Sequence, residues 1–424
     1  MPLRLLRFGL NKTYKEPRMF RAPATLKDEY DVPATLKDEY DVVIIGGGGH
    51  GLAAAYYLAK HHNITNVAVL EQGYIGSGGT GRNTAIIRSN YLTPEGVRFY
   101  EKSVELYKGL SRELRFNLFY TERGHYTLAH SDAALRTARW RAEVNQHLGV
   151  NSEVVDPDFI KKHNPEIDIT CGGHQPPVMG ALYHPPGAIA RHDAVAWAFA
   201  RGADERGVEI HQQTAVNDIE IKDGAVTGVH TNRGFVKAKK VLSAVAGWTT
   251  AITQMVGLRT PLVIHPLQAF VSEPIKPWLD TIIVSGSLHI YISQSTRGEL
   301  VSGAALDPYE LINTRSTLDF AEGLSGHLID LFPCLSGVKV MRQWAGLCDM
   351  TPDFSPIMGR TPVHGFYIDA GWGTYGFKAT PVCGLTMAHT IARDEDHDLI
   401  RAFSLSRFER MTLVGEKGAA SVGH

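Results

Sequence analysis

Three glycines near the start of the chain have the spacing of a dinucleotide-binding turn. Gly46, Gly48 and Gly51 form G-x-G-x-x-G between a β-branched run and an Ala/Leu-rich stretch. In such a turn the first glycine bends the chain, the second admits a diphosphate, and the third lets helix and strand pack closely. A helix that begins near Gly49 and His50 directs its free N–H groups at the phosphates. The pattern predicts a nucleotide site.

An acidic residue follows at the distance expected for a ribose contact. The run "NVAVLE" predicts a second strand ending in Glu71, 20 residues after Gly51. A carboxylate there accepts hydrogen bonds from ribose hydroxyls and repels the 2′-phosphate of NADP. The alternative is a glycine turn without a ligand. At this point NAD and FAD both remain open.

A second glycine-rich loop favours the larger cofactor. The stretch "GYIGSGGTGRNTAIIRSNY" contains Gly79, Arg82, Thr84 and Arg88. Backbone donors and two guanidinium groups suit a second approach to a diphosphate and then a bulky ring, which NAD rarely requires. The alternative is a mobile surface loop with a solvated arginine. We interpret the loop as part of an FAD site.

A third glycine segment lies about 300 residues later. A strand over residues 366–369 runs into Gly373, Gly376 and Lys378, and Thr380-Pro381 is predicted to open a helix, with Thr380 as its cap. Reduced flavin carries negative charge, which a helix N-terminus and Lys378 would stabilise. An ordinary strand-to-helix turn is the alternative.

The elements that must position these residues alternate in type. Strand 40–45, a helix and strand 67–71 form a βαβ unit, and residues 208–216 and 237–250 are predicted as paired strands of the same sheet. A helix is predicted to start at Thr93-Pro94. The fold class is α/β, α+β overall, with a Rossmann-like FAD-binding domain interleaved with an antiparallel-sheet substrate domain. The predicted divisions are an arm at 1–39, an FAD-binding domain at 40–92, 184–262 and 340–424, and a substrate domain at 93–183 and 263–339.

Composition limits the class of protein. The 424 residues are 44% hydrophobic and 21% charged, with a net charge of −1. This balance gives no electrostatic reason for binding nucleic acid or a membrane surface. Residues 42–59 are the most apolar stretch, but glycines interrupt them. The four cysteines show no CxxC spacing. We therefore expect a cytoplasmic protein with no metal ion and no disulfide framework.

Residues 23–42 contain the same decamer twice, "PATLKDEYDV". Two copies of a polar decamer are too few and too short for a solenoid. Only the second copy runs into the glycine turn, so residues 23–32 are interpreted as a surface spacer.

The chain resembles the β subunits of heterotetrameric sarcosine oxidases, in the glycine-oxidase/D-amino-acid-oxidase-like flavoprotein family. The resemblance rests on "DVVIIGGGGHGLAAAYYLAK", "GRNTAIIRSNY", "IARHDAVAWAFAR", "HPLQAFVSEPIKP" and "DAGWGTYGFKATP", and it runs from about residue 40 to the C-terminus. It implies non-covalent FAD and a second flavin, FMN, attached covalently to His192. It implies FAD contacts from Gly49, His50, Glu71, Gly79, Thr84, Ile86, Val216, Gly373, Gly376 and Lys378.

The resemblance also implies a reaction and partners. Sarcosine loses hydride to FAD, electrons pass to FMN and then to O2 to give H2O2, and the imine carbon goes to tetrahydrofolate. The α subunit is expected to bind NAD and tetrahydrofolate and the δ subunit zinc, with γ completing the heterotetramer. Arg191 beside His192 would favour an anionic reduced flavin. Arg88 and Lys378 are our candidates for holding the substrate carboxylate; the alternative for Arg88 is a structural ion pair.

Two departures from the family pattern bear on the substrate. Tyr375 stands where the family has glycine, which predicts an altered backbone angle or a phenol near the flavin. Residues 357–360, "IMGR", also differ and are expected on the substrate side. The alternatives are a dehydrogenase subunit for a related amine, such as dimethylglycine or proline, and a flavin-binding electron-transfer subunit that does not itself catalyse.

Overall fold

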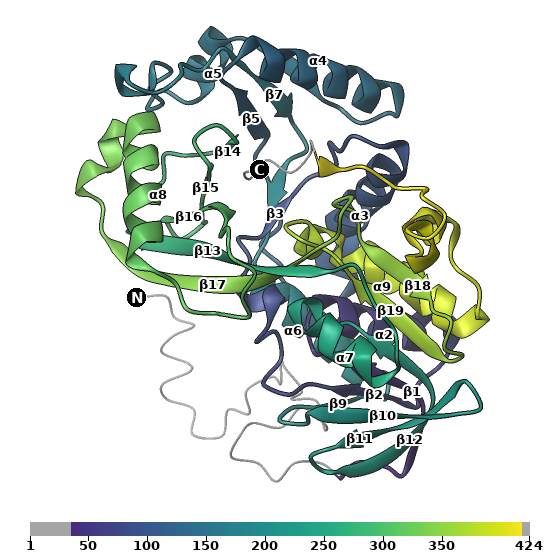
Figure 1. The fold of residues 1–424 in the computed structure, drawn as a ribbon. Coiled ribbons are helices and arrows are strands. Elements are labelled where there is room, and N and C mark those ends of the chain that lie inside the picture. The colour runs from purple at the N-terminus through teal and green to yellow at the C-terminus, as the bar shows by residue number, and fades with distance from the viewer. Residues whose placement is uncertain (1–34, 418–424) are drawn as a thin grey trace, which may run out of the picture.

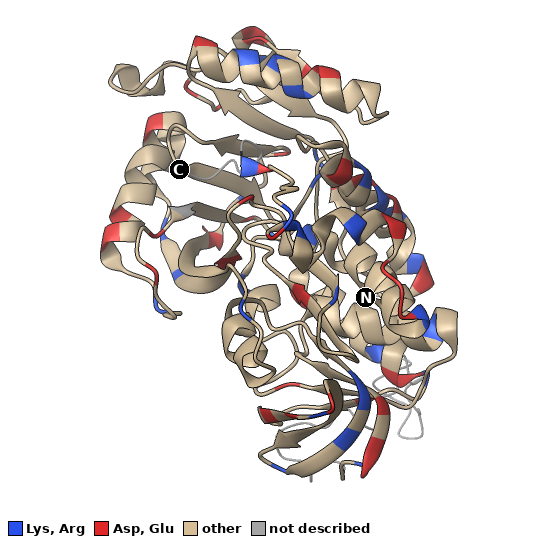
Figure 2. Cartoon of the chain, turned by 45° about the vertical axis from the view of Figure 1, so that its right-hand side comes forward, with Lys and Arg blue, Asp and Glu red and all other residues tan. Residues whose placement is uncertain are grey.

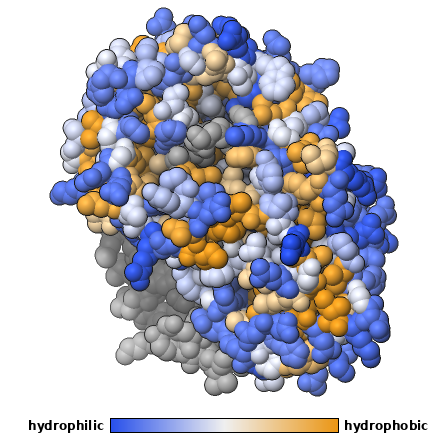
Figure 3. All heavy atoms as spheres, viewed as in Figure 1, coloured by the Kyte–Doolittle hydropathy of each residue, from blue (hydrophilic) through white to orange (hydrophobic). Residues whose placement is uncertain are grey.

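The computed structural model describes residues 35–417, so the arm before residue 35 and the first copy of the decamer lie outside the described residues. Two eight-stranded sheets and one three-stranded sheet form the framework (Figure 1). Among the described residues no helix is both long enough and apolar enough to cross a membrane. Acidic and basic residues are interspersed along the outer helices in the view of Figure 2. Apolar patches alternate with hydrophilic ones on the face in Figure 3.

The first sheet contains the predicted βαβ unit. Its order is β10-β11-β12-β1-β2-β9, with β19 on β12 and β18 on β19. The strands β9, β2, β1, β12 and β19 run parallel, and β10, β11 and β18 pair antiparallel with their neighbours. The bounds are β1 Glu39–Ile45, β2 Val67–Leu70, β9 Glu209–His211, β10 Val216–Lys222, β11 Ala225–Thr231, β12 Gly234–Ser243, β18 Ile357–Arg360 and β19 Phe366–Ala370.

The parallel strands are buried on both faces, as their continuous apolar sequences require. Residues 42–45 of β1 and 67–70 of β2 are largely buried. The prediction that residues 208–216 pair with 237–250 was wrong: β9 pairs with β2, and β12 pairs with β1. Both segments do belong to this sheet, but β1 and β2 lie between them. The chain that leaves helix α6 (His192–Asp204) therefore enters β9, the strand at one edge of this sheet.

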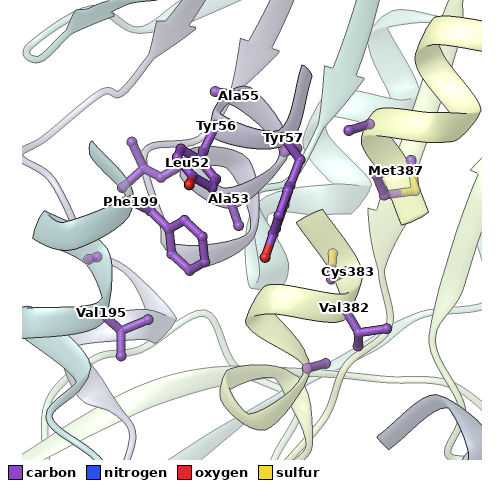
Figure 4. Packing of buried hydrophobic residues seen from close by; sticks show 14 of the residues in the cluster. Leu52, Ala53, Ala55, Tyr56, Tyr57, Val195, Phe199, Val382, Cys383 and Met387 are labelled. Carbon is purple, nitrogen blue, oxygen red and sulfur yellow. The ribbon is translucent and has the colours of Figure 1, made fainter. Parts of the chain in front are cut away.

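Three helices cover one side of this sheet. Helix α2 (Gly49–His62) lies between α6 (His192–Asp204) and α9 (Gly376–Arg393), and Figure 4 shows Tyr56, Tyr57 and Phe199 packing together at this contact. The alanines of α2 permit a close approach, because a Cβ at Gly384 would lie 2.4 Å from the Cβ of Ala53. Small residues thus bring the N-terminal ends of α2 and α9 together.

Helix α9 begins earlier than the sequence suggested. It starts at Gly376, so Thr380 does not cap it and Pro381 lies inside the helix. Proline has no N–H to offer the carbonyl of Phe377 four residues before it. That carbonyl instead accepts hydrogen bonds from the hydroxyls of Tyr107 (2.9 Å) and Thr380 (2.8 Å). Neighbouring hydroxyls compensate for the missing donor, so the helix continues through the proline.

The second sheet is mostly antiparallel, in the order β17-β13-β16-β15-β14-β5-β7-β6. Only β14 and β5 pair in parallel. Helices α4, α5 and α8 lie over this half of the molecule (Figure 1). The bounds are β5 His125–Ala129, β6 Glu153–Val155, β7 Gly180–His184, β13 Val263–Pro274, β14 Ile282–Ser285, β15 Ile290–Gln294, β16 Glu299–Leu306, β17 Val340–Met350, α4 Asp132–His147, α5 Pro157–His163 and α8 Leu318–Leu331.

Two elements cross the predicted domain boundaries. Strand β17 pairs with β13 along its length, so residues 340–350 belong to the antiparallel sheet. Helix α3 (Pro94–Glu113) starts where predicted, with Thr93 accepting a hydrogen bond from Gly96 N, but its apolar face lies in the core of the first sheet. The other divisions remain a proposal. The third sheet, β3 (Ile86–Ile87), β8 (Ala188–Ile189) and β4 (Thr121–Glu122), joins the two halves.

Candidate functional site

The three glycine segments predicted from the sequence line one cavity between the two large sheets. Gly48, Gly79 and Gly376, which lie far apart in sequence, all contribute to its wall. The cavity has a volume of about 1870 Å³, counting the space open to solvent. Of the predicted cofactor and substrate residues, it is lined by Gly46, Gly48, Gly49, His50, Glu71, Gly79, Arg82, Thr84, Ile86, Arg88, Val216, Gly373, Gly376 and Lys378.

The first glycine turn has the geometry that its spacing predicts. Gly46 has a φ of +111°, and a Cβ there would lie 2.4 Å from the carbonyl oxygen of Ala244. Gly51 does not line the cavity. A Cβ on Gly51 would lie 2.1 Å from the carbonyl oxygen of Gly46, so its role is close packing of helix against strand. Neither α2 nor α9 has a side-chain N-cap, so both present backbone N–H groups at the cavity.

Glu71 holds the two glycine loops as well as lining the cavity. One carboxylate oxygen accepts from Gly47 N (2.8 Å), and the other accepts from Gly73 N (2.7 Å) and the hydroxyl of Ser77 (3.2 Å). A carboxylate has about four acceptor positions, so it retains capacity for a ribose hydroxyl. The sequence predicted the ribose contact and missed the structural contacts to the loops.

The second loop is attached to both halves of the molecule. Thr80 Oγ1 accepts from Gly49 N at 2.9 Å, which ties the loop to the start of α2. Arg82 donates to the carbonyls of Ser77 (3.2 Å) and Ala345 (3.0 Å), and its own carbonyl accepts from Trp344 Nε1 (2.7 Å). Arg82 therefore fixes the loop against β17. The loop is held by hydrogen bonds and is not the mobile loop that we considered as an alternative.

Two buried cations lie at one end of the cavity. The guanidinium of Arg88 lies 4.6 Å from the ring centre of Tyr91 and donates to the side-chain oxygen of Asn90 at 3.0 Å. Lys378 Nζ donates to the carbonyl of Thr374 at 3.2 Å. Burial lowers the pKa of Lys378 well below its usual range, and the charge of Arg88 lowers it further. Two basic groups that are buried at one cavity wall are suited to receive an anion.

Tyr375 requires no unusual backbone angle in this chain. Its φ of −107° and ψ of −8° are ordinary for any L-residue. The buried ring instead packs edge-on against Tyr91, with 5.2 Å between ring centres, and lies 5.6 Å from Lys378 Nζ. The phenol thus encloses the two cations. Residues 357–360 form β18 and do not line this cavity, contrary to the prediction.

His50 connects the N-termini of the two helices. Its Nδ1 lies 3.0 Å from the carboxylate of Asp369, and its Nε2 lies 2.8 Å from the carbonyl oxygen of Gly376. Both partners are acceptors, so both ring nitrogens donate and the imidazole is charged. Burial lowers the pKa of His50, but the carboxylates of Asp369 and Asp349 and the carbonyl of Gly376 together raise it more, so the pKa lies above 6.5.

Cys383 donates to the same carboxylate at 2.9 Å. The ligand-type atoms of His50, Asp369 and Cys383 lie within 4.8 Å of one another. Their mutual hydrogen bonds account for this arrangement.

Sequence patterns missed several residues of the cavity wall. Asp349 ends β17 and accepts from the backbone N–H of Gly371 (2.6 Å) and Trp372 (3.2 Å), and burial raises its pKa to about 6. His125 and Tyr291 come from strands of the second sheet. These residues follow no glycine pattern, and only the pairing of distant strands brings them to the cavity. The sequence offered one signal for these residues, which is that they lie in predicted extended runs or near the ends of strands.

A second cavity, of about 1760 Å³ with its solvent-open space, adjoins the first. Residues 80 and 82–85 line both cavities, so the second glycine loop forms part of the wall between them. His192 and Arg191 line the second cavity and not the first. Arg191 forms a two-pronged ion pair with Asp193 (3.0 and 2.6 Å), which partly offsets its charge.

His192 begins α6, and its Nδ1 is buried without a hydrogen-bond partner among the described residues. Burial lowers the pKa of His192, so its ring is neutral near pH 7. A neutral imidazole with an unengaged nitrogen is a competent nucleophile.

Comparison with known proteins agrees with this geometry. The family model described as FAD dependent oxidoreductase matches residues 41–390. The chain belongs to this family of FAD-dependent oxidoreductases. The uncapped N-termini of α2 and α9, the absent side chains at Gly46 and Gly48 and the carboxylate of Glu71 fit the diphosphate and ribose of FAD.

Within that family, the relatives include sarcosine oxidase β subunits. The chain is 47% identical over 384 residues to "Sarcosine oxidase subunit beta" of Arthrobacter sp, covering 90% of this chain and 94% of the relative. It is 28% identical to the glycine oxidase of Bacillus subtilis, covering 88% and 98%. The crystal structure of L-proline dehydrogenase from P. horikoshii superposes with a TM-score of 0.84 at 29% identity, covering 89% of this chain and 100% of that chain.

Proposed function

We propose that this chain catalyses the FAD-dependent oxidation of sarcosine, as the β subunit of a heterotetrameric oxidase. The observation that carries the proposal is the placement of Arg88 and Lys378 in the cavity lined by the three glycine segments. A small amino acid needs one fixed anchor for its carboxylate beside the flavin ring. The identity to sarcosine oxidase β subunits supports the choice of substrate.

The chain's own residues divide the work of binding FAD and substrate. Gly46 and Gly48 leave room for the diphosphate at the N-terminus of α2, and Glu71 accepts the ribose hydroxyls. Bound FAD would accept the hydride from the substrate carbon. The N-terminus of α9 and Lys378 stabilise negative charge that develops on this side of the cavity. Tyr375 and Tyr91 exclude water from Arg88, which strengthens its attraction for the carboxylate.

We further propose that the second cavity holds FMN, joined covalently to His192. The neutral imidazole of His192, whose buried Nδ1 has no hydrogen-bond partner among the described residues, supports this assignment. FMN there would pass electrons to O2 to give H2O2. The imine carbon would go to tetrahydrofolate on an α subunit that also binds NAD, with a zinc-binding δ subunit and a γ subunit completing the assembly. The names of the relatives as subunits support an assembly of this kind.

A second candidate is a dehydrogenase subunit for a related amine, such as proline or dimethylglycine. The superposition on an L-proline dehydrogenase favours it. Both candidates use the same cavity and differ in the amine and in the electron acceptor.

Anaerobic reduction of the flavin distinguishes these functions. The protein, co-expressed with its partner subunits, is mixed without oxygen with sarcosine, dimethylglycine, proline or glycine, and the loss of flavin absorbance is followed. We expect sarcosine to reduce the flavin fastest and to give H2O2 when air is admitted. Fastest reduction by proline without peroxide would support the dehydrogenase. No reduction by any of these amines would refute the proposed function.

The variant Arg88→Lys tests whether this chain binds the substrate itself. Lysine cannot form the two-pronged contact of a guanidinium with a carboxylate, so we expect the Kd for sarcosine to rise about 10- to 100-fold. The flavin content should not change, because we assign the diphosphate and ribose of FAD to the glycine turn and Glu71 and not to Arg88. An unchanged Kd would favour an electron-transfer subunit whose partner performs the oxidation.

The covalent link has a separate test. Acid precipitation should leave yellow flavin in the pellet of the wild type and remove it from the pellet of His192→Ala, while non-covalent FAD stays in the supernatant of both. A colourless wild-type pellet would exclude His192 from this role.

A further inference from the structure

One histidine of the first cavity has no assigned role, and one of its two ring nitrogens has no hydrogen-bond partner within the described residues. His125 is the first residue of β5, is 1% exposed and lines the cavity together with Arg88 and Lys378. Its Nδ1 is buried and makes no hydrogen bond within residues 35–417. Buried polar groups in folded proteins are almost always paired, so an exception beside a binding cavity indicates a partner that arrives with the ligand.

The neighbouring histidine, His184, is equally buried but has hydrogen-bond partners, as expected of a histidine with a structural role. His184 lies directly opposite His125 in the pairing of β5 with β7. Its Nδ1 donates to the carbonyl of Asn151 (2.8 Å), and its Nε2 lies 3.3 Å from the hydroxyl of Ser89. Burial lowers the pKa of His184 to about 3, so it stays neutral and both its nitrogens are occupied. His125 has the same burial without these partners.

The backbone holds His125 firmly in position. A Cβ on Gly187 would lie 2.4 Å from the Cβ of His125, so only glycine allows the chain to pass there. The carbonyl of Gly187 accepts from Arg123 N (2.7 Å) and Gly124 N (2.9 Å), which fixes the residues just before His125. The backbone of His125 is thus fixed, while its Nδ1 has no hydrogen-bond partner among the described residues. Such a side chain is suited to contact a ligand.

Among residues 35–417, the ionisable groups whose charge acts on His125 are all basic. They are Arg88, His184, Arg141 and Lys378. Burial lowers the pKa of His125 well below its usual range, and these groups lower it further. The ring is therefore neutral before substrate binds. A carboxylate held by Arg88 and Lys378 would offset both charges and make His125 more basic when the substrate is in place.

We propose that His125 binds the amino group of the substrate and accepts its ammonium proton. The proposal deepens the proposed function, on which it rests. An amino acid whose carboxylate lies between Arg88 and Lys378 carries its nitrogen one carbon away, within the same closed end of the cavity. His125 supplies an acceptor for this nitrogen.

The proton and electron balance is simple. The substrate ammonium loses H⁺ to a ring nitrogen of His125, which leaves a neutral amine and an imidazolium. The nitrogen lone pair then forms the C=N bond as the adjacent C–H bond breaks. The hydride, with its electron pair, leaves to oxidised FAD, the cofactor of the family. A protonated amine has no lone pair for this step, so removal of the proton must come first.

The experiment measures flavin reduction by sarcosine against pH, without oxygen, in the co-expressed complex. The variant is His125→Gln, which keeps a polar side chain but cannot take a proton. We expect the second-order rate constant of reduction to fall about 100-fold or more at pH 7. In the variant the rate should rise about tenfold per pH unit, because only free amine reacts, and should approach the wild-type rate near the pKa of the amine.

His130→Gln is the matched control. His130 follows the same strand and is 5% exposed, but its ring is engaged by the carbonyl of Pro176 (2.8 Å) and the hydroxyl of Ser285 (2.9 Å). The rate of flavin reduction by the His130→Gln variant, taken per bound flavin, and its dependence on pH should match those of the wild type. Rates are taken per bound flavin, so partial misfolding of a variant does not mimic the effect.

Two results would overturn the role of His125. The first is a His125→Gln rate within threefold of the wild type at pH 7. The second is a deficit that stays constant across the pH range, because a merely structural role would lower the rate equally at every pH. A wild-type protein that is not reduced by any amino acid refutes the proposed function and this role together, whereas a reducible wild type with an unaffected variant refutes only the role of His125.

Discussion

The substitution Gly51→Ala tests the link between close packing and FAD binding. The new Cβ would lie 2.1 Å from the carbonyl oxygen of Gly46, below the 3.0 Å that real Cβ atoms keep from their neighbours. The obstacle is backbone, which cannot rotate away as a flexible side chain could. Helix α2 and the turn must therefore separate by about 1 Å. This movement displaces the helix N-terminus that we assign to the diphosphate.

The size of the effect follows from two opposing contributions. Alanine is favoured over glycine inside a helix by about 0.5–1 kcal/mol. Overpacking of a tightly packed site costs about 1–3 kcal/mol. We expect a net loss of about 1–2 kcal/mol in the free energy of unfolding. The displaced N–H groups should weaken FAD binding at least tenfold, which corresponds to about 1.4 kcal/mol.

The assay compares Gly51→Ala with Gly109→Ala. Gly109 lies inside α3, and a Cβ there meets nothing within 4 Å. The Gly109→Ala control therefore gains helix propensity without a steric clash. It should be slightly more stable than the wild type, and its affinity for FAD should be unchanged. Urea unfolding and titration of flavin-depleted protein with FAD measure both quantities. If Gly51→Ala behaves like Gly109→Ala in both, the assignment of Gly51 to packing is refuted.

Two further predictions concern buried charges. Asp353 and Arg407 form an ion pair at 2.8 and 2.9 Å, with both side chains 1% exposed. Asp353→Asn leaves the guanidinium without its counter-charge and should cost about 3–5 kcal/mol in urea unfolding; a loss below about 1 kcal/mol would contradict this. His50 has a folded-state pKa above 6.5, so its stabilising contact with Asp369 is fully present below pH 6.5 and is lost as the pH rises through the folded-state pKa. The stability difference between wild type and His50→Gln should therefore shrink with rising pH, and a difference that grows would refute a charged His50.

The local elements and the nucleotide turn were readable in the sequence because they depend on neighbouring residues. The spacing of Gly46, Gly48 and Gly51 specifies a strand-turn-helix that forms wherever it occurs. Thr93 caps α3 through a contact three residues away. The start of α9 was misjudged, because the carbonyl freed by its proline is occupied by the hydroxyl of Thr380 and by that of Tyr107, which comes from a distant helix.

The tertiary structure decided which side chains meet. The order of the chain does not bring His125 and Lys378 to one cavity or Arg82 to β17. Long-range packing between segments about 250 residues apart does so. Tyr375 departs from the glycine of the family pattern, and only the folded structure shows that its ring packs against Tyr91. Sequence specified the glycine turns through local backbone geometry, and the long-range packing of the two sheets built the cavities around them.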